Sequence, residues 1–224
     1  MKFYKLKCSL DLKEIGDYPQ IQNFRKGYNP NRRESCSQIS RFFFGKKPDV
    51  EIDFDCLEMA TKAKLTDYVS CSYLSQLTGL LVSNKLFKFL SALKMPDHIS
   101  YAAPIYQKGE TLSSDYKWVH FTGFYPEMIN FPASNFYLDH SEVNYKELSI
   151  NSLLEYNAAQ NNIQYKINAK KLVLKQEVAY ASDILRIGSV RNETYISEVI
   201  KNEVITQGFT GMVFEPADYL VVEG

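Results

Sequence analysis

The chain has 224 residues, with 26 basic and 26 acidic side chains and a formal net charge of zero. A general nucleic-acid binder is expected to carry a basic excess for counterion release, so this balance argues against one. Apolar runs such as Leu80-Leu81-Val82 fall far short of the roughly 18 residues that a membrane helix needs. We therefore expect a soluble protein with no nucleic-acid partner and no membrane span, built as a single unit over residues 1–224.

The N-terminal residues and the cysteines predict a cytoplasmic location. Met1–Lys7 alternates charged and apolar residues, which indicates an edge strand rather than a signal peptide. The four cysteines, Cys8, Cys36, Cys56 and Cys71, have no CxxC spacing. In a chain without an export signal, we expect them to be reduced and partly buried thiols.

Charge is segregated along residues 25–56. Residues 25–47 are basic, with Glu34 as the only acid, and Gly16–Pro30 is rich in turn residues. After Pro48, apolar residues at positions 50, 52, 54 and 56 alternate with acids. This period of two predicts a half-buried strand whose outer face carries Asp49, Glu51, Asp53 and Asp55.

The remaining pattern mixes helices and strands. Ser83 and Ser197 are candidate N-caps of two helices, the first ending before Pro96 and the second at Gly208. A further helix is expected over Ser149–Ala159, and residues 124–137 are expected to form a loop. The other strands are predicted over 98–106, 116–122, 163–178 (bent near Asn168) and 211–216. The fold class is therefore α+β, with mixed or antiparallel sheets and a few flanking helices.

Two segments of the chain resemble each other. Leu81–Leu86, a helix and Ile99–Tyr101 run parallel to Tyr195–Ile200, a helix and Met212–Phe214, with a gap of one or two residues. Either both are ordinary capped helices followed by strands, or the chain contains a duplicated unit with two similar lobes, 1–122 and 123–224. Two copies do not decide between these alternatives.

No catalytic or metal motif is present. His98, His120 and His140 lie far apart, without HxxxH or HExxH spacing, and no GxSxG, GxxxxGK[ST] or GxGxxG occurs. We therefore expect no catalytic residues, no metal and no cofactor. The four acids on one strand face also lack the contrast between a desolvated and a charged carboxyl that acid–base catalysis needs. They fit a solvated face, a contact surface for a basic partner or, less well, a metal site, and the basic stretch before them could pair with them internally.

The C-terminal segment resembles a known family. Ile196-Ser197-Glu198 opens a helix, and Gly208-Phe209-Thr210-Gly211-Met212-Val213-Phe214-Glu215-Pro216 follows it. This pattern is similar to the closing motif of the immunity-eleven family of bacterial polymorphic-toxin immunity proteins. Trp118 and the Leu80–Ser83 helix entry also look similar, whereas residues 1–60 hardly do, and Arg191-Asn192-Glu193 stands where members carry an Asp-rich stretch.

The resemblance implies a cytoplasmic antidote that binds a cognate toxin domain stoichiometrically and needs no reacting groups. The expected contact residues are Asp49, Glu51, Asp53 and Asp55, with Phe124, Tyr125, Phe131 and Tyr137 as aromatic anchors.

Two alternatives stay open. One is a hydrolase or transferase whose site gathers His120, Asp115, Glu127 or Cys71. The other is a homo-oligomeric scaffold that pairs edge strands Lys2–Leu6 and Tyr219–Val222 between chains. The sequence leaves the oligomeric state open.

Overall fold

The strands of the described residues form four sheets. The computed structural model describes residues 1–41, 47–75, 78–141, 144–162, 167–180, 182–188 and 190–223. Sheet pairing is mostly antiparallel with two parallel pairs, and short helices flank the sheets. The predicted α+β class is confirmed.

Two of the sheets are fully antiparallel. The first contains, in spatial order, β12 (Ile184–Arg186), β13 (Thr194–Ser197), β1 (Phe3–Cys8) and β14 (Met212–Pro216). The second contains β4 (Gly79–Ser83), β8 (Tyr116–Phe121) and β5 (His98–Ala102).

The other two sheets are mixed. The third contains β2 (Ile21–Phe24), β3 (Leu57–Met59), β6 (Ile105–Gln107) and β7 (Glu110–Ser113), with β3 and β6 parallel. The fourth contains β10 (Asn144–Leu148), β9 (Asn135–Ser141), β11 (Ile167–Leu174) and β15 (Leu220–Val222), with β11 and β15 parallel.

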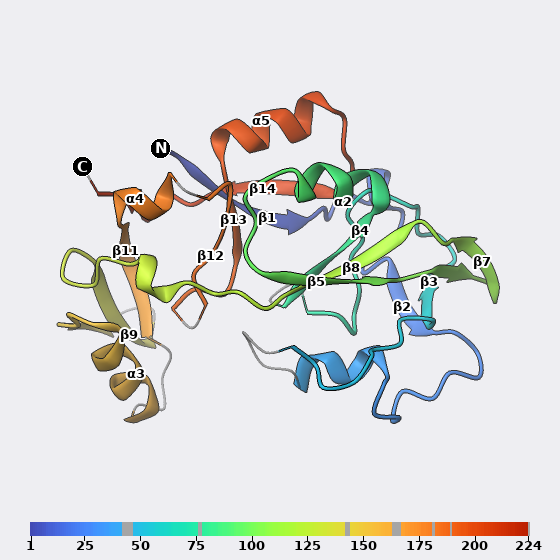
Figure 1. Cartoon of the computed structure of the whole chain (residues 1–224), viewed down its shortest axis with the longest axis horizontal. Helices are drawn as coiled ribbons and strands as arrows, with labels where there is room; N and C mark the ends of the chain where they lie inside the picture. Colours follow the sequence, from blue (N-terminus) through green and yellow to red (C-terminus); the bar gives the residue numbers. More distant parts are fainter. Residues whose placement is uncertain are drawn as a thin grey trace.

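The helices are short. They are α1 (Leu12–Ile15), α2 (Asn84–Ser91), α3 (Leu153–Asn162), α4 (Gln176–Ala179) and α5 (Glu198–Thr206), with 3₁₀ turns at Cys36–Arg41 and Pro126–Met128. Figure 1 shows β9, β11 and α3 at one end of the molecule and β2, β3 and β7 at the other.

The prediction that the N-terminal strand lies at an edge is wrong. β1 lies between β13 and β14 and pairs with both. The lysines of this strand form ion pairs with acids of the neighbouring segments. Lys5 pairs with Glu193 at 3.1 Å, and Lys7 pairs with Glu215 at 2.6 Å. Alternating charge here reflects cross-strand pairing rather than protection of an open edge.

The expected loop over residues 124–137 is only partly correct. A 3₁₀ turn and irregular backbone occupy residues up to 134, but β9 begins at Asn135. The expected strand over 98–106 is interrupted before β6, and β7 was not expected. Of the expected strand 163–178, residues 163–166 lie outside the described residues. β11 ends at Leu174 and residues 176–178 belong to α4, so the end of the expected strand is wrong. β11 carries a register irregularity between Ala169 and Lys171.

Both predicted helix caps are confirmed, and the segments around them have the same topology. Ser83 Oγ accepts a hydrogen bond from Leu86 N at 3.1 Å, and Ser197 Oγ accepts one from Ile200 N at 3.4 Å. In each unit a strand leads into the capped helix and then into a second strand. A third strand lies between the two and is antiparallel to both: β8 between β4 and β5, and β1 between β13 and β14.

The register of the two units is also the same. Ser83 lies opposite Tyr116, and Ser197 lies opposite Phe3. Ala103 N donates to Tyr116 O, and Ala217 N donates to Phe3 O, both at 3.0 Å. Equivalent positions of the two units are therefore 114 residues apart from the first strand to the last (83 to 197, 103 to 217). The alignment predicted from the sequence, which contained a gap and matched Ile99 with Met212, is wrong: Ile99 matches Val213. The proposed division into lobes 1–122 and 123–224 stays a prediction.

Three apolar clusters stabilise these sheets. One packs α2 and α5 together through Leu86, Leu90, Ile200 and Val204. Another fills the end formed by β9, β11 and α3. The third includes Trp118 of β8 and the buried side chains of residues 50–59, among them Phe54 and Leu57.

Candidate functional site

Four acidic side chains line an open surface groove of about 730 Å³, which we call the acidic groove. Its charged lining consists of four carboxylates and one guanidinium group, so negative charge is in excess. The lining residues are Arg32, Glu34, Glu51, Ile52, Asp53, Phe54, Asp55, Ser100, Tyr101, Ala102 and Pro104. Three of the four acids predicted for partner contact therefore lie together in one concavity.

Residues 49–56 present their acids outward by the predicted alternation. Ile52, Phe54 and Cys56 are buried, whereas Asp49 and Glu51 are exposed. The segment is nevertheless not a strand: it makes one isolated parallel bridge, between Ser35 and Asp53, and β3 begins only at Leu57.

A hydrogen bond of the Asp53 side chain explains why residues 49–56 do not form the backbone ladder of a strand. Asp53 Oδ1 accepts a hydrogen bond from Asp55 N at 2.7 Å. Such a local bond from side chain to backbone occupies a donor that a ladder would use. The period of two thus predicted which side chains are buried but not the hydrogen bonding of the backbone.

The basic stretch pairs with the acids, as one of the sequence interpretations allowed. Arg25 contacts Asp55 at 2.7 Å and Arg33 contacts Asp49 at 2.5 Å. A third ion pair joins Arg32 and Asp53. Lys46, also part of the basic stretch, lies outside the described residues.

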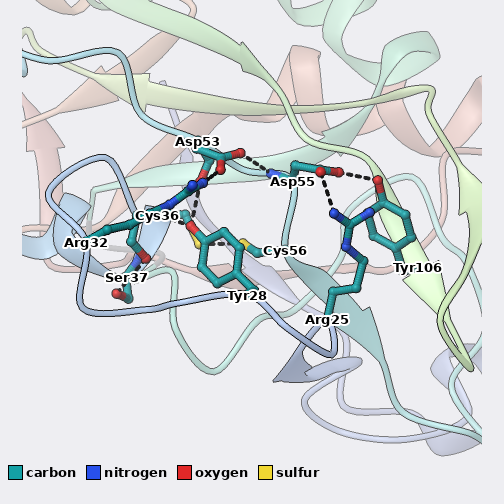
Figure 2. Close-up of polar contacts among 10 residues, drawn as sticks. Arg25, Tyr28, Arg32, Cys36, Ser37, Asp53, Asp55, Cys56 and Tyr106 are labelled. Carbon is teal, nitrogen blue, oxygen red and sulfur yellow. Dashed lines mark hydrogen bonds and ion pairs between the residues drawn. The ribbon is translucent and has the colours of Figure 1, made fainter.

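Aromatic rings fix the positions of two of these arginines. The Arg25 guanidinium lies 4.4 Å from the ring centre of Tyr106, whose hydroxyl also donates to Asp55. The Arg32 guanidinium lies 5.0 Å from the ring centre of Tyr28. Figure 2 shows both arginines directed at their carboxylates. Because the planar guanidinium groups are both stacked and paired, they hold Asp53 and Asp55 in fixed orientations.

Glu34 and Glu51 differ from the other acids of the groove. Among the described residues, neither carboxylate forms an ion pair. Both side chains are exposed, and both line the acidic groove. A cationic group that enters the groove can therefore pair with these two carboxylates without breaking an existing ion pair.

The wall of the groove is aromatic. Tyr101 lies 5.2 Å from the ring centre of Phe54, which in turn packs 6.3 Å from Trp118. Burial raises the pKa of Tyr101, and the nearby charge of Glu51 adds to the effect. The phenol is therefore a neutral hydrogen-bonding group at neutral pH. Tyr101 and Glu34 were missed at the sequence level, because only the fold brings β5 and the basic stretch next to residues 51–55.

The predicted aromatic anchors lie elsewhere. Phe131 is 4% exposed and stacks on Phe136 at 5.8 Å, so its ring belongs to the core and not to the surface. Phe124 is half-buried beside the guanidinium of Arg186, at 5.1 Å. Tyr125 and Tyr137 are also half-buried, and the Tyr125 hydroxyl accepts a hydrogen bond from Asp97 N at 3.4 Å. None of the four lines the acidic groove.

Two residues of the enzymatic alternative, His120 and Asp115, lie at opposite ends of β8. His120 is 1% exposed near the end of β8, whereas Asp115 is exposed just before its start, roughly 15 Å away along an extended strand. Glu127 is exposed in a 3₁₀ turn on another segment. Burial raises the pKa of Cys71 to about 12, so it is a thiol and not a nucleophilic thiolate at neutral pH.

The described residues contain no group of three or more His, Cys, Asp or Glu side chains placed to hold a metal ion. None of the helices in the described part of the chain has the length and apolar character required to span a bilayer. Comparison of the chain with protein-family models and with curated protein sequences found no match.

Proposed function

We propose that this protein binds and neutralises a toxin domain in stoichiometric, non-catalytic fashion, and that it acts in the cytoplasm. The partner surface is the acidic groove, and the partner contributes a basic segment or patch. The observation that carries the proposal is the pair of exposed carboxylates Glu34 and Glu51, which form no ion pair with any described residue. They lie in a concavity whose other acids are paired with arginines.

Electrostatic complementarity supports this choice of partner. A surface with an excess of one charge speeds association with a partner of opposite charge and discriminates against partners of like charge. A rigid, already paired network also reduces the side-chain entropy that binding would cost. Tyr101 at the groove wall supplies the aromatic contact that binding hot spots commonly contain.

The family resemblance supports the identity of the partner as a toxin, and the structure supports the roles of the motif residues in the fold. Ser197 caps α5, Gly208 and Gly211 have φ of 68° and 82°, and Pro216 ends β14. The motif therefore describes a fold element, and the binding proposal rests on the groove.

Co-expression with a polymorphic-toxin domain tests the proposal. Cells that express the toxin are expected to grow when this protein is present, and the two proteins are expected to co-purify in a one-to-one complex. Absence of both rescue and a complex at micromolar concentration would contradict the proposal. Rescue without a complex, accompanied by chemical change of the toxin, would favour the enzymatic alternative.

A further inference from the structure

The sulfur atoms of Cys36 and Cys56 lie 2.8 Å apart beneath the acidic groove. Both side chains are fully buried, and Figure 2 shows the two sulfurs facing each other beside the Tyr28 ring. The two cysteines come from separate segments, the start of the 3₁₀ turn and the residue before β3. No spacing motif predicts the pairing.

Backbone hydrogen bonds hold the two segments in register. Cys36 N donates to Asp53 O at 3.1 Å, and Asp53 N donates to Glu34 O at 2.6 Å. The Tyr28 hydroxyl donates to Asp53 O at 3.0 Å and accepts from Cys36 N at 3.2 Å. The thiols are therefore brought together by the same contacts that position the acids of the groove.

We propose that Cys36 and Cys56 are a redox-active pair that a peroxide oxidises to a disulfide, which locks the acidic segment onto the basic stretch. The two cysteines are 20 positions apart, and the loop that the bond would close carries Asp49, Glu51, Asp53 and Asp55. This inference does not depend on the identity of any partner.

The two thiols differ in a way that defines their roles. The hydrogen bond with Cys56 lowers the pKa of Cys36, although burial opposes the effect. The same hydrogen bond and burial raise the pKa of Cys56. This difference favours Cys36 as the sulfur that attacks peroxide first, with Cys56 keeping its proton until the second step.

The reaction balances with one molecule of hydrogen peroxide. The Cys36 thiolate attacks one peroxide oxygen, the O–O bond breaks, and the departing hydroxide takes up the proton that Cys36 released. The Cys56 sulfur then attacks the resulting sulfenic acid, the S–O bond breaks, and the Cys56 proton leaves with the hydroxyl as a second water. Two electrons pass from the two thiols to the peroxide. Because both sulfurs are buried, peroxide reaches them only when the two segments separate locally. The disulfide, once formed, prevents this separation.

Peptide mapping of the full chain tests the proposal. After hydrogen peroxide treatment, the wild-type protein is expected to lose two of its four thiols, with Cys36 and Cys56 in one cross-linked peptide that dithiothreitol separates. Cys36→Ser and Cys56→Ser are expected to abolish the crosslink, whereas Cys8→Ser and Cys71→Ser, as matched controls, retain it. The wild-type map remains decisive if a variant at the pair fails to fold.

Closing the loop is also expected to raise the melting temperature of the oxidised protein by about 6 to 12 °C. The amides of Cys36 and Asp53 are expected to exchange hydrogen at least about tenfold more slowly, since local opening is restricted. Four free thiols after peroxide treatment, a crosslink through Cys71, or sulfinic acid at Cys36 beside an intact Cys56 thiol would each overturn the proposal.

Discussion

Asp67 and Thr210 are joined by hydrogen bonds that connect the two units of equal topology. Asp67 Oδ2 accepts from Thr210 N at 3.0 Å and from Thr210 Oγ1 at 3.1 Å. Its other oxygen, Oδ1, accepts from the hydroxyl of the cap residue Ser83 at 2.7 Å. One carboxylate therefore ties the cap of α2 to the turn that follows α5.

Replacing this carboxylate is expected to lower stability. Asp67→Ala leaves the Thr210 amide and two hydroxyls without their acceptor, so we expect a loss of about 2–3 kcal/mol in the free energy of unfolding. Urea denaturation measures this change. Asp218→Ala, at an exposed acid, is the control and is expected to cost less than about 0.5 kcal/mol. Equal effects of the two substitutions would show that the Asp67 contacts do not stabilise the fold.

These contacts also show what sequence patterns can predict. The caps at Ser83 and Ser197 were predicted because a cap bonds to an amide within its own helix, so the signal is local. The position of β1 could not be predicted, because its partners β13 and β14 lie at the other end of the chain.

The acidic groove likewise combines features that a local sequence pattern predicts with features that depend on contacts between distant segments. The alternation over residues 49–56 correctly predicts that Ile52, Phe54 and Cys56 are buried, because burial follows the period, whereas Val50, Asp53 and Asp55 are all half-buried. The contacts that complete the groove depend on long-range packing. Tyr101 reaches the groove from β5, and Cys36 contacts Cys56 beside the isolated bridge between Ser35 and Asp53. No periodic pattern in the sequence predicts either contact.

The ion pairs around the groove are expected to differ in their contributions to stability. Arg33 and Asp49 are about two-thirds exposed (66% and 67%), so Asp49→Ala is expected to cost less than about 1 kcal/mol. Asp53 is more buried and also accepts from Asp55 N, so Asp53→Ala is expected to cost about 1–3 kcal/mol. Chemical denaturation of the two alanine variants checks the order. A larger loss for Asp49→Ala would be inconsistent with the described network.

Stability is expected to fall in alkaline solution through the buried thiol of Cys8. Burial raises its pKa to about 12, above the ordinary value near 9. The unfolded chain therefore releases this proton at a lower pH than the folded protein does. The contribution is complete below about pH 9 and is lost between about pH 9 and 12, at a rate approaching 1.4 kcal/mol per pH unit.

Comparison with Cys8→Ala isolates this contribution. The variant loses packing at every pH, but its free energy of unfolding is expected to fall less steeply than that of the wild type between about pH 9 and 11. Denaturation curves at a series of pH values measure the two slopes. Parallel slopes would mean that Cys8 titrates alike in the folded and unfolded states.

Arg186 is expected to be the charged residue whose removal is most damaging. It is fully buried, its guanidinium lies 4.9 Å from the ring centre of Phe121 and 5.1 Å from that of Phe124, and it donates to Thr194 Oγ1 at 2.6 Å. Arg186→Ala removes these contacts and leaves a cavity, so we expect a loss of at least about 3 kcal/mol. Lys88→Ala, at an exposed position on α2, is the control and is expected to be near neutral. Thermal melts of both variants test this; a tolerated Arg186→Ala would show that the buried guanidinium is dispensable.

The affinity of the toxin domain for groove variants tests the central claim most directly. Glu34→Lys combined with Glu51→Lys reverses the charge of the two groove carboxylates for which the described residues show no ion pair. We predict that calorimetry shows at least about tenfold weaker binding, or about 1.4 kcal/mol, for this double variant. Glu147→Lys, at an exposed position of β10 outside the groove, is predicted to bind like the wild type. Unchanged affinity of the double variant, in a protein that still folds and binds the toxin, would contradict the assignment of the acidic groove as the binding surface.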